Sequence, residues 1–148
     1  MRMEAENYFV GEIVVVLATG TRVPAKVSAD EICGPNNKET YRITLEQGAE
    51  IKIAESQVDF FDALIKLRLD LEKTGTLLCC FGASENVYPS GMQRSMGPAV
   101  LAYKMRLGSP TSRQDIVNIF ESDETVVPAT VEQQEGFHRR WGDSLQRR

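Results

Sequence analysis

The stretch "YRITLEQGAEIKIAESQVDFFDALIKLRLDLEKTG", residues 41–75, decides the fold class, because its apolar spacing changes from every second residue to helical spacing. In residues 41–54, apolar and polar residues alternate on both sides of a Gln47-Gly48-Ala49 turn, which predicts a β-hairpin. The expected apolar face consists of Tyr41, Ile43 and Leu45 in the first strand and of Ile51 and Ile53 in the second.

Residues 56–75 predict an amphipathic helix. Ser56 and Asp59 form a capping-box pattern at its start, and Gly75 supplies a stop. The apolar stripe contains Phe60, Leu64, Leu67 and Leu71, widened by Phe61, Ile65 and Leu69. The charged residues fall on the opposite face, namely Asp59, Asp62, Lys66, Asp70 and Lys73.

The residues before the hairpin predict two further strands. Residues 13–18 and 22–28 are rich in β-branched side chains and are joined by a Thr19-Gly20-Thr21 turn. Pro24 cannot donate a ladder hydrogen bond, so it places the second strand at a sheet edge or at a bulge. Such an edge is expected to offer a pairing surface for a strand of another protein, as in an accessory subunit.

The residues after the helix predict two more strands. Residues 76–81 are apolar or small throughout, which is typical of a central strand that is buried on both faces. Residues 100–108 alternate and predict a half-buried strand. Its buried face is expected to carry Leu101, Tyr103, Met105 and Leu107.

Two helices are predicted near the end of the chain. Residues 112–122 begin with a Ser112 cap, and Ile116, Ile119 and Phe120 give a short apolar face. Residues 130–148 begin with a Thr130–Gln133 capping box and carry a stripe of Phe137, Trp141 and Leu145, so His138 is expected to point outward. The whole pattern predicts one α+β domain over residues 1–148, with a mostly antiparallel sheet and two or three helices packed on one side.

The charge distribution bears on the kind of partner. Residues 1–89 hold nine Lys or Arg and fourteen Asp or Glu, whereas residues 90–148 hold eight and seven. No basic stripe of the kind that nucleic-acid binders carry is present, so a nucleic-acid partner is not expected. The acidic first half would suit a basic protein partner, and the alternative is a solvated surface that keeps the protein soluble.

The cysteines and the apolar runs bear on localisation. Cys33, Cys79 and Cys80 form neither a disulfide framework nor a metal-binding spacing, which is typical of the reducing cytoplasm. The first twenty residues contain Glu4, Glu6 and Glu12 and do not resemble a signal peptide. No apolar run approaches the length of a membrane span, so we expect a cytoplasmic protein without membrane attachment.

The reactive side chains and motifs of the sequence favour a protein that is not an enzyme. A Cys–His or Ser–His pair would have to use His138, the single histidine. No phosphate-binding glycine motif and no metal-binding His or Asp spacing occurs. We therefore predict no catalytic residue, no metal site and no cofactor.

Residues 81–100, "FGASENVYPSGMQRSMGPAV", are the candidate binding site, because a loop of this length in a small domain is usually functional or hides a short helix. Ser90 is placed to cap such a helix, with Met92 and Met96 on one side. Tyr and Arg are enriched at binding hot spots. The polar groups predicted to bind are Asn86, Tyr88, Ser90, Gln93, Arg94 and Ser95. The alternative is a structural loop in which Tyr88 and Met96 fill the edge of the core.

Two functions follow from this loop. The first is a non-catalytic binding protein that acts through a protein–protein interaction. The second is a small-molecule site, or an enzyme site, between the strand at 76–81 and the loop at 82–97, where Arg94 would hold an anion and Tyr88 would stack on a ring. An enzyme would in addition need Cys79, Cys80 or His138.

The runs "CCFGASENVYPSGMQRSMGPAVLAYKMRLG" (79–108), "QDIVNIF" (114–120) and "VPATVEQQEGFHRRW" (127–141) carry a resemblance to known sequences. Over residues 60–145 the chain resembles a set of small bacterial cytosolic proteins of undefined function. The resemblance supplies no site residues. In size, acidity and lack of catalytic groups the chain also resembles the immunity proteins that neutralise bacterial toxins, which implies a protein partner and leaves the oligomeric state open.

Overall fold

The computed structural model describes residues 4–95 and 97–146, which form eight strands in two antiparallel sheets and three α-helices. The predicted α+β class is therefore confirmed, with two antiparallel sheets in place of one. The larger sheet has the order β4-β3-β2-β1-β5, made of β1 (Glu4–Val16), β2 (Arg22–Cys33), β3 (Glu39–Gln47), β4 (Glu50–Ser56) and β5 (Leu77–Cys79). The smaller sheet has the order β6-β7-β8, made of β6 (Val87–Tyr88), β7 (Leu101–Lys104) and β8 (Ile116–Asn118). The helices are α1 (Phe60–Glu72), α2 (Gly91–Ser95) and α3 (Val131–Gln146).

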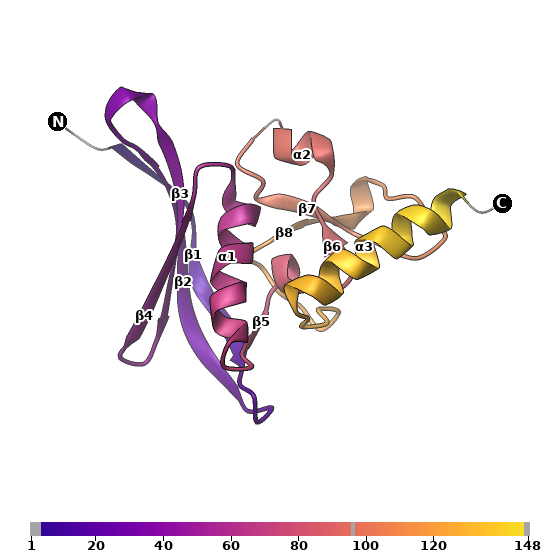
Figure 1. Cartoon of the computed structure of the whole chain (residues 1–148), viewed down its shortest axis with the longest axis horizontal. Coiled ribbons are helices and arrows are strands. Elements are labelled where there is room, and N and C mark those ends of the chain that lie inside the picture. Colours follow the sequence, from indigo (N-terminus) through magenta and orange to yellow (C-terminus); the bar gives the residue numbers. More distant parts are fainter. Residues whose placement is uncertain (1–3, 96, 147–148) are drawn as a thin grey trace.

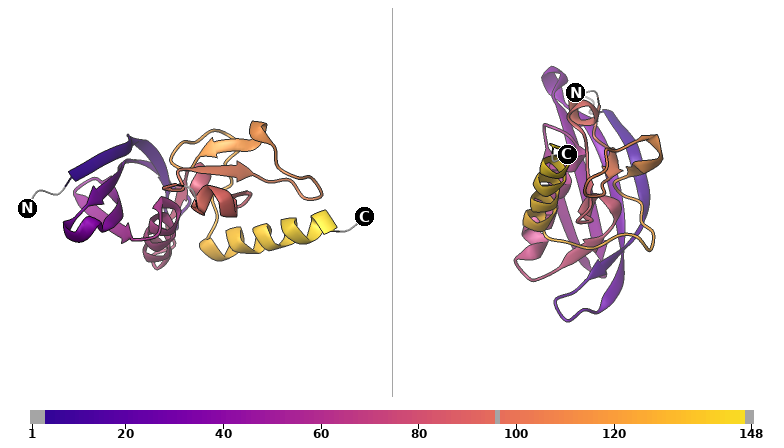
Figure 2. Two further views of the ribbon diagram at one scale, coloured as in Figure 1. Left: turned by 90° about the horizontal axis from the view of Figure 1, so that it is seen from above. Right: turned by 90° about the vertical axis from the view of Figure 1, so that its right-hand side faces the viewer.

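All three helices lie on one side of the five-stranded sheet, and its other face is uncovered (Figure 1). Helix α1 packs directly on the sheet, and the smaller sheet and α3 lie beyond it (Figures 1 and 2). Phe60 at the start of α1 joins these layers, because its ring contacts Tyr41 of β3 at 5.1 Å and Phe120, after β8, at 6.0 Å. One hydrophobic cluster includes buried residues of both sheets.

The β3–β4 hairpin forms as predicted, with Gly48 at φ +60° in a two-residue turn. The predicted apolar face of its second strand is wrong, because Ile51 and Ile53 are about 60% exposed on the uncovered face of the sheet. Cross-strand partners share a face, and Leu45 pairs with Lys52, so Lys52 lies on the α1 side. Its ammonium donates to Asp70 of α1 at 2.9 Å. The register between β3 and β4 decides which face of β4 meets α1. The alternation of apolar residues in the sequence does not decide it.

The β1–β2 hairpin is longer than predicted, because β1 begins at Glu4 and β2 continues to Cys33. Its turn contains Gly20 at φ +86°, and the Leu17 N–H donates to the Thr21 carbonyl at 2.9 Å. β2 as a whole is not an edge strand, because it lies between β1 and β3, but Pro24 lies in the part of β2 that pairs with β1 alone. Pairing with β3 starts only at Lys26, so the missing N–H of Pro24 costs no bond to β3.

Helix α1 has the predicted stripe, with Phe60, Leu64, Leu67 and Leu71 buried and Gly75 at φ +72° after its end. Its predicted cap is wrong. Asp59 is the N-cap, accepting from the Asp62 N–H at 2.7 Å, whereas Ser56 ends β4 and accepts from the Val58 N–H. The polar and apolar faces also differ from the prediction, because Asp59 and Arg68 are buried while Leu69 is 49% exposed.

The segment after α1 is buried, but not as a central strand. β5 has three residues and pairs only with Val14–Val16 of β1, so it is an edge strand. The chain then forms a 3₁₀ turn, Phe81–Ala83, whose three residues are buried. The Gly82 N–H donates to the Ile119 carbonyl at 2.8 Å. The residues that directly follow β8 therefore cover this turn.

The predicted strand at 100–108 has the opposite face buried near its start. Leu101 and Leu107 are about half exposed, whereas Ala102 and Met105 are buried. The predicted helix at 112–122 is wrong beyond its cap. Ser112 and Asp115 form the capping box on a 3₁₀ turn, Arg113–Asp115, and the following residues pair with β7 as β8.

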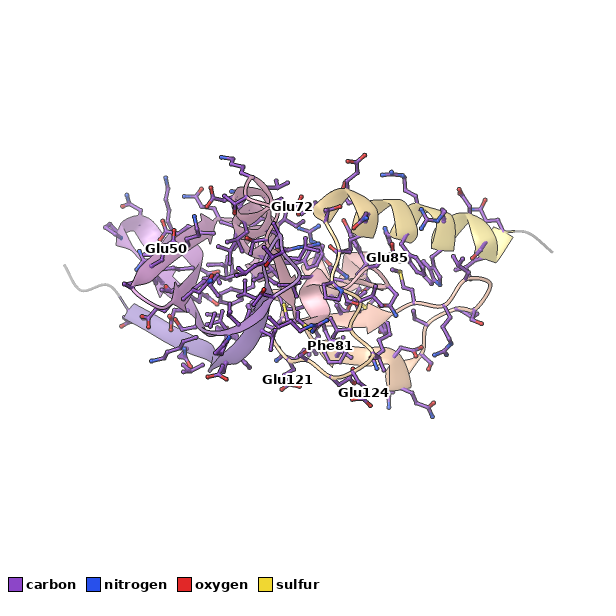
Figure 3. The ribbon with its side chains drawn as sticks, turned by 90° about the horizontal axis from the view of Figure 1, so that it is seen from below. Glu50, Glu72, Phe81, Glu85, Glu121 and Glu124 are labelled. Carbon is purple, nitrogen blue, oxygen red and sulfur yellow. The ribbon has the colours of Figure 1, made fainter. Side chains whose placement is uncertain are left out.

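Helix α3 begins as predicted, because Thr130 and Gln133 exchange side-chain and backbone hydrogen bonds of 2.9 and 3.1 Å. A second cap comes from α1, where the Glu72 carboxylate accepts from the Val131 N–H at 2.9 Å. Figure 3 shows Glu72 where α1 meets the start of α3. The predicted stripe at positions 137, 141 and 145 is only half-buried, and Val131 and Gln134 are the buried residues of this helix.

Candidate functional site

Three of the six predicted binding residues maintain the local fold. Ser90 Oγ accepts from the Gln93 N–H at 3.0 Å, and the Ser90 N–H donates to Gln93 Oε1 at 2.8 Å, so these two residues cap α2. The short helix and its cap are thus confirmed. Asn86 accepts from Ser84 Oγ through its side chain and from the Met105 N–H through its carbonyl. Met96 lies outside the described residues.

Arg94 is held by Asp59. Its Nε donates to Asp59 Oδ2 at 3.0 Å and its Nη2 donates to Oδ1 at 3.4 Å, while the guanidinium lies 5.3 Å from the centre of the Phe61 ring. Asp59 is fully buried, and this pair ties α2 to the start of α1. An anionic ligand would have to compete with Asp59 for the same edge of the guanidinium. The remaining predicted residue on α2, Ser95, is exposed and donates to the Met92 carbonyl.

Tyr88 belongs to a row of aromatic rings between α1 and α3. Its ring packs against Phe61 at 5.1 Å and stacks on His138 at 4.0 Å with an interplanar angle of 10°. His138 in turn lies 6.0 Å from Trp141. The prediction that His138 points outward is therefore wrong, because position 138 lies on the side of α3 that faces β6.

The single histidine provides a direct test of this stacking. Burial lowers the pKa of His138 below its ordinary 6.5, because the packed environment disfavours the charged imidazolium. We expect the imidazole C–H signals in proton NMR to titrate with a midpoint below 6.5, and Tyr88→Leu to move the midpoint upward. The unfolded chain binds the proton first as the pH falls, so the folded state loses stability below about pH 6.5. His138→Gln should remove that loss, and a midpoint at or above 6.5 would show that burial does not disfavour the charged imidazolium in the folded protein.

An open pocket of about 300 Å³ lies between β1, α2 and the segment that leads into β7. Tyr8, Gln93 and residues 97–101 line it, and we call it the apolar pocket. Of the six predicted binding residues, Gln93 lines this pocket. Met92 on α2 is 70% exposed and Leu101 on β7 is 47% exposed. The candidate site is therefore formed largely by the last part of the predicted stretch 81–100, on the side that faces β1.

The wall of the apolar pocket contains a strained backbone position. Ala99 is buried and has φ +58°, a left-handed conformation that costs a residue with a Cβ about 1 kcal/mol or more. The flanking bonds hold it there. The Phe60 N–H donates to the Pro98 carbonyl at 2.7 Å, and the Ile119 N–H donates to the Val100 carbonyl at 2.8 Å. Strain of this kind concentrates at functional sites.

Tyr8 connects the apolar pocket to a group of carboxylates. Its hydroxyl donates to Glu31 Oε1 at 3.0 Å, and Glu31, Glu4 and Glu6 line a neighbouring hollow of about 400 Å³. We call these three residues the acidic strip. Burial is the main cause that raises the pKa of Tyr8, and the hydrogen bond to Glu31 is the second. The phenol therefore stays protonated and remains a donor. Sequence reasoning missed Tyr8 because the predicted first strand began at residue 13.

A β-bulge places the Tyr8 side chain. Asn7 pairs with Asp30 and Phe9 pairs with Ala29, so Tyr8 is an extra residue in β1. Its ring packs on Phe60 at 5.2 Å and therefore lies on the α1 side of the sheet. The sequence signal that could have found it is the alternation of Glu4, Glu6 and Tyr8.

The thiols of Cys79 and Cys80 do not line the apolar pocket. Burial raises the pKa of the Cys80 thiol to about 11, which keeps it protonated. Cys79 is also buried, and its sulfur contacts Arg22 and Ser122. Within residues 4–95 and 97–146, no group of three or more His, Cys, Asp or Glu side chains is placed to hold a metal ion.

The comparisons with known proteins do not identify a family. No protein-family model matches the chain, and no curated protein matches it. In the part of the chain that the structure describes, no helix combines the length and the apolar character needed to cross a membrane. The geometry of the site is therefore the basis on which a function can be argued.

Proposed function

We propose that this chain is a non-catalytic binding protein that holds a basic partner protein at the apolar pocket and the acidic strip. One observation carries the proposal. Tyr8 lines the apolar pocket with its ring and donates to Glu31 of the acidic strip with its hydroxyl, so the two surfaces are continuous. A partner that presents an apolar side chain next to basic ones matches this surface in both shape and charge.

The apolar half of the surface is suited to a buried anchor. The pocket is lined by the ring of Tyr8 and by Pro98, Val100 and Leu101, and Met92 is exposed on α2. Protein interfaces concentrate their binding energy in aromatic and aliphatic anchors that fill such pockets, and methionine adapts to irregular surfaces. The hydrogen bonds on both sides of Ala99 hold the pocket wall in one conformation, which reduces the entropy lost on binding.

The acidic half supplies attraction over distance. Residues 1–89 contain fourteen Asp or Glu against nine Lys or Arg, and Glu4 and Glu6 belong to this half and are exposed. Such a surface accelerates the encounter with a basic protein and weakens as salt is added.

Within this class, we infer a protein that neutralises a basic bacterial toxin. The support is the combination of an acidic surface, an adjoining anchor pocket and thiols that are all free, Cys33, Cys79 and Cys80. Free cysteines are typical of proteins in a reducing compartment, which supports a cytoplasmic location in this proposal.

The test compares two exposed leucines. We expect Leu101→Lys to reduce capture of the partner from cells of the source organism about tenfold, because it removes an anchor and adds a charge of the same sign as the partner. Leu107→Lys is the matched control, since Leu107 is 54% exposed and does not line the apolar pocket. Quantitative mass spectrometry of proteins bound to the tagged chain gives the readout.

The two arms of this experiment have definite meanings. A basic protein retained by the wild type and by Leu107→Lys but lost by Leu101→Lys supports the proposal. Equal capture by all three proteins contradicts it. For the toxin inference, the captured protein is expressed alone and together with this chain. Growth inhibition that the wild type relieves and Leu101→Lys does not relieve is the expected result.

An apolar small molecule is the second candidate, and the dimensions of the pocket favour it. About 300 Å³ is at the lower end of ligand pockets, and its lining is mostly apolar. A compound that fills it should raise the melting temperature of the wild type and of Leu107→Lys but not of Leu101→Lys. This outcome, without protein capture, would replace the protein partner with a small ligand.

A further inference from the structure

Residues 4–12 of β1 form a free sheet edge. They pair with β2 on one side, whereas β5 pairs only with Val14–Val16 on the other side. Among the described residues, no further backbone hydrogen bond reaches this edge. In Figure 2, β1, drawn in dark indigo, runs along the border of the sheet.

The direction of the free backbone groups follows from the ladder. Pairs in an antiparallel ladder alternate between hydrogen-bonded and non-bonded. The Leu17 N–H bonds to the Thr21 carbonyl at the turn, so the Val10–Ser28 pair, seven steps along an uninterrupted register, is non-bonded. The N–H and C=O of Val10 therefore point away from β2, toward the free edge. The Val10 side chain lies on the uncovered face and is 59% exposed.

The side chains along this edge are those of the proposed binding surface. Glu6 pairs with Glu31, and Glu31 pairs with Tyr41, whose ring packs on Phe60 of α1. Glu4 and Glu6 are two residues apart, so both lie on the α1 side together with Tyr8. Every second residue in this part of β1 therefore faces the α1 side. Glu4 and Glu6 contribute carboxylates there, and Tyr8 lines the apolar pocket.

We propose that an extended segment of the basic partner adds to the free edge of β1 as a further strand. This inference rests on the proposed function and specifies how the partner binds. Basic side chains at alternate positions of the segment would meet Glu4 and Glu6, and an apolar side chain two positions further along would enter the pocket at Tyr8. Strand addition gives main-chain hydrogen bonds for affinity and side-chain pockets for specificity.

The charges argue against a second copy of this chain as the occupant. Residues 4–12 contain Glu4, Glu6 and Glu12 and no Lys or Arg. An antiparallel pairing of two β1 strands about Tyr8 would place Glu4 directly opposite Glu12. Like charges in that position destabilise a strand pair, whereas a segment with Lys or Arg at these positions is attracted.

The experiment uses a fluorescent peptide, Arg-Thr-Arg-Thr-Leu-Thr-Val-Thr, and the same sequence in reverse, because the strand direction is open. A peptide of equal composition with its pattern broken, Arg-Arg-Thr-Thr-Leu-Val-Thr-Thr, is the control. We expect one alternating peptide to bind the wild type at least about tenfold more tightly than the control in fluorescence anisotropy. Val10→Pro should weaken this binding about tenfold, because proline removes an outward N–H, whereas Val10→Thr should not.

Hydrogen exchange gives a readout that does not depend on how the proline variant folds. In the wild type, the Val10 amide should exchange quickly alone and slowly with the alternating peptide bound. Equal binding of the alternating and control peptides, equal binding by the two Val10 variants, or no protection of the Val10 amide would each overturn strand addition. A dimer in the wild type that Val10→Pro dissociates would also overturn it, in favour of a second copy.

The failure of this inference and the failure of the proposed function can be told apart. If Leu101→Lys loses the captured partner while Val10→Pro keeps it, the pocket binds the partner without strand addition, and the proposed function stands. If neither variant changes capture, the proposed function fails as well.

Discussion

Replacing Arg68 with methionine is expected to lower the free energy of unfolding by about 3–5 kcal/mol, the largest effect of any substitution considered for this protein. Arg68 is buried in the middle of the molecule and donates to three uncharged oxygens. Its Nη1 donates to the Gly82 carbonyl at 3.2 Å and to Gln134 Oε1 at 2.6 Å, and its Nη2 donates to the Ala129 carbonyl at 3.1 Å.

These bonds connect four separate parts of the chain. Arg68 lies on α1, Gly82 in the 3₁₀ turn, Ala129 before α3 and Gln134 within α3. Gln134 is itself fully buried, and its amide donates to the carbonyls of Gly82, Ser84 and Val87. Methionine fills much of the volume of the arginine stem but leaves Gln134 Oε1 and the Ala129 carbonyl without a donor, while the Gly82 carbonyl keeps the donor from Gln134. Each such oxygen costs about 1–3 kcal/mol.

Urea unfolding, followed by the fluorescence of Trp141, measures the effect, because Trp141 is the single tryptophan and lies on α3. Arg42→Met is the control. Arg42 pairs with Glu55 at 2.6 Å on the surface, where its loss should cost less than about 1 kcal/mol. Arg68→Lys retains the charge but not the planar donors, so it should fall between the two. A loss below about 1 kcal/mol for Arg68→Met would show that the four segments are held together by other contacts.

Replacing Gly82 with alanine is expected to destabilise the protein by about 2–3 kcal/mol. A Cβ at this position would lie 2.5 Å from Leu64 Cδ2, 2.8 Å from Ile119 Cβ and 3.1 Å from the Ile119 carbonyl oxygen. Leu64 can rotate its side chain, but Ile119 presents its branch point and its backbone. The carbonyl of Gly82 also accepts from Arg68 and Gln134, so any shift of the turn weakens these bonds.

Gly91→Ala is the matched control for Gly82→Ala, because no atom lies within 4 Å of a Cβ built at Gly91 in α2. We expect that variant to be as stable as the wild type or slightly more stable. Both variants are compared by thermal and urea unfolding. Equal stability of the two variants would mean that the turn moves without cost and that the close approach of Gly82 to Leu64 and Ile119 is not required.

The local patterns of the sequence determined the elements whose information is itself local. The β3–β4 hairpin, the apolar stripe of α1, the Ser90 cap of α2 and the Thr130 cap of α3 depend on residues a few positions apart. The α+β class follows from these elements. Propensity, capping and turn chemistry are properties of short segments, so one sequence is enough to recognise them.

The faces of the strands required the tertiary structure. Alternation shows that two faces differ, but only the register shows which of them meets the helix. Lys52 lies toward α1 because it pairs with Leu45 and its ammonium donates to Asp70. Ile51 and Ile53 therefore lie on the uncovered face of the sheet. Ala102 is buried in place of Leu101 for the same kind of reason, since the face of β7 that carries Ala102 packs on the hydrophobic cluster.

The site was decided by contacts between residues far apart in the chain. The sequence indicated the region around α2, but it could not show that Arg94 is held by Asp59 or that Tyr88 stacks on His138. It also could not show that Tyr8 joins the apolar pocket to the acidic strip. The sequence by itself therefore determined the first two hairpins, the apolar stripe of α1, the caps of α2 and α3, and the acidic character of the first half. The tertiary structure alone decided which side chains are used within the fold and which remain free to bind, because long-range packing distributes hydrogen-bond partners and burial among them.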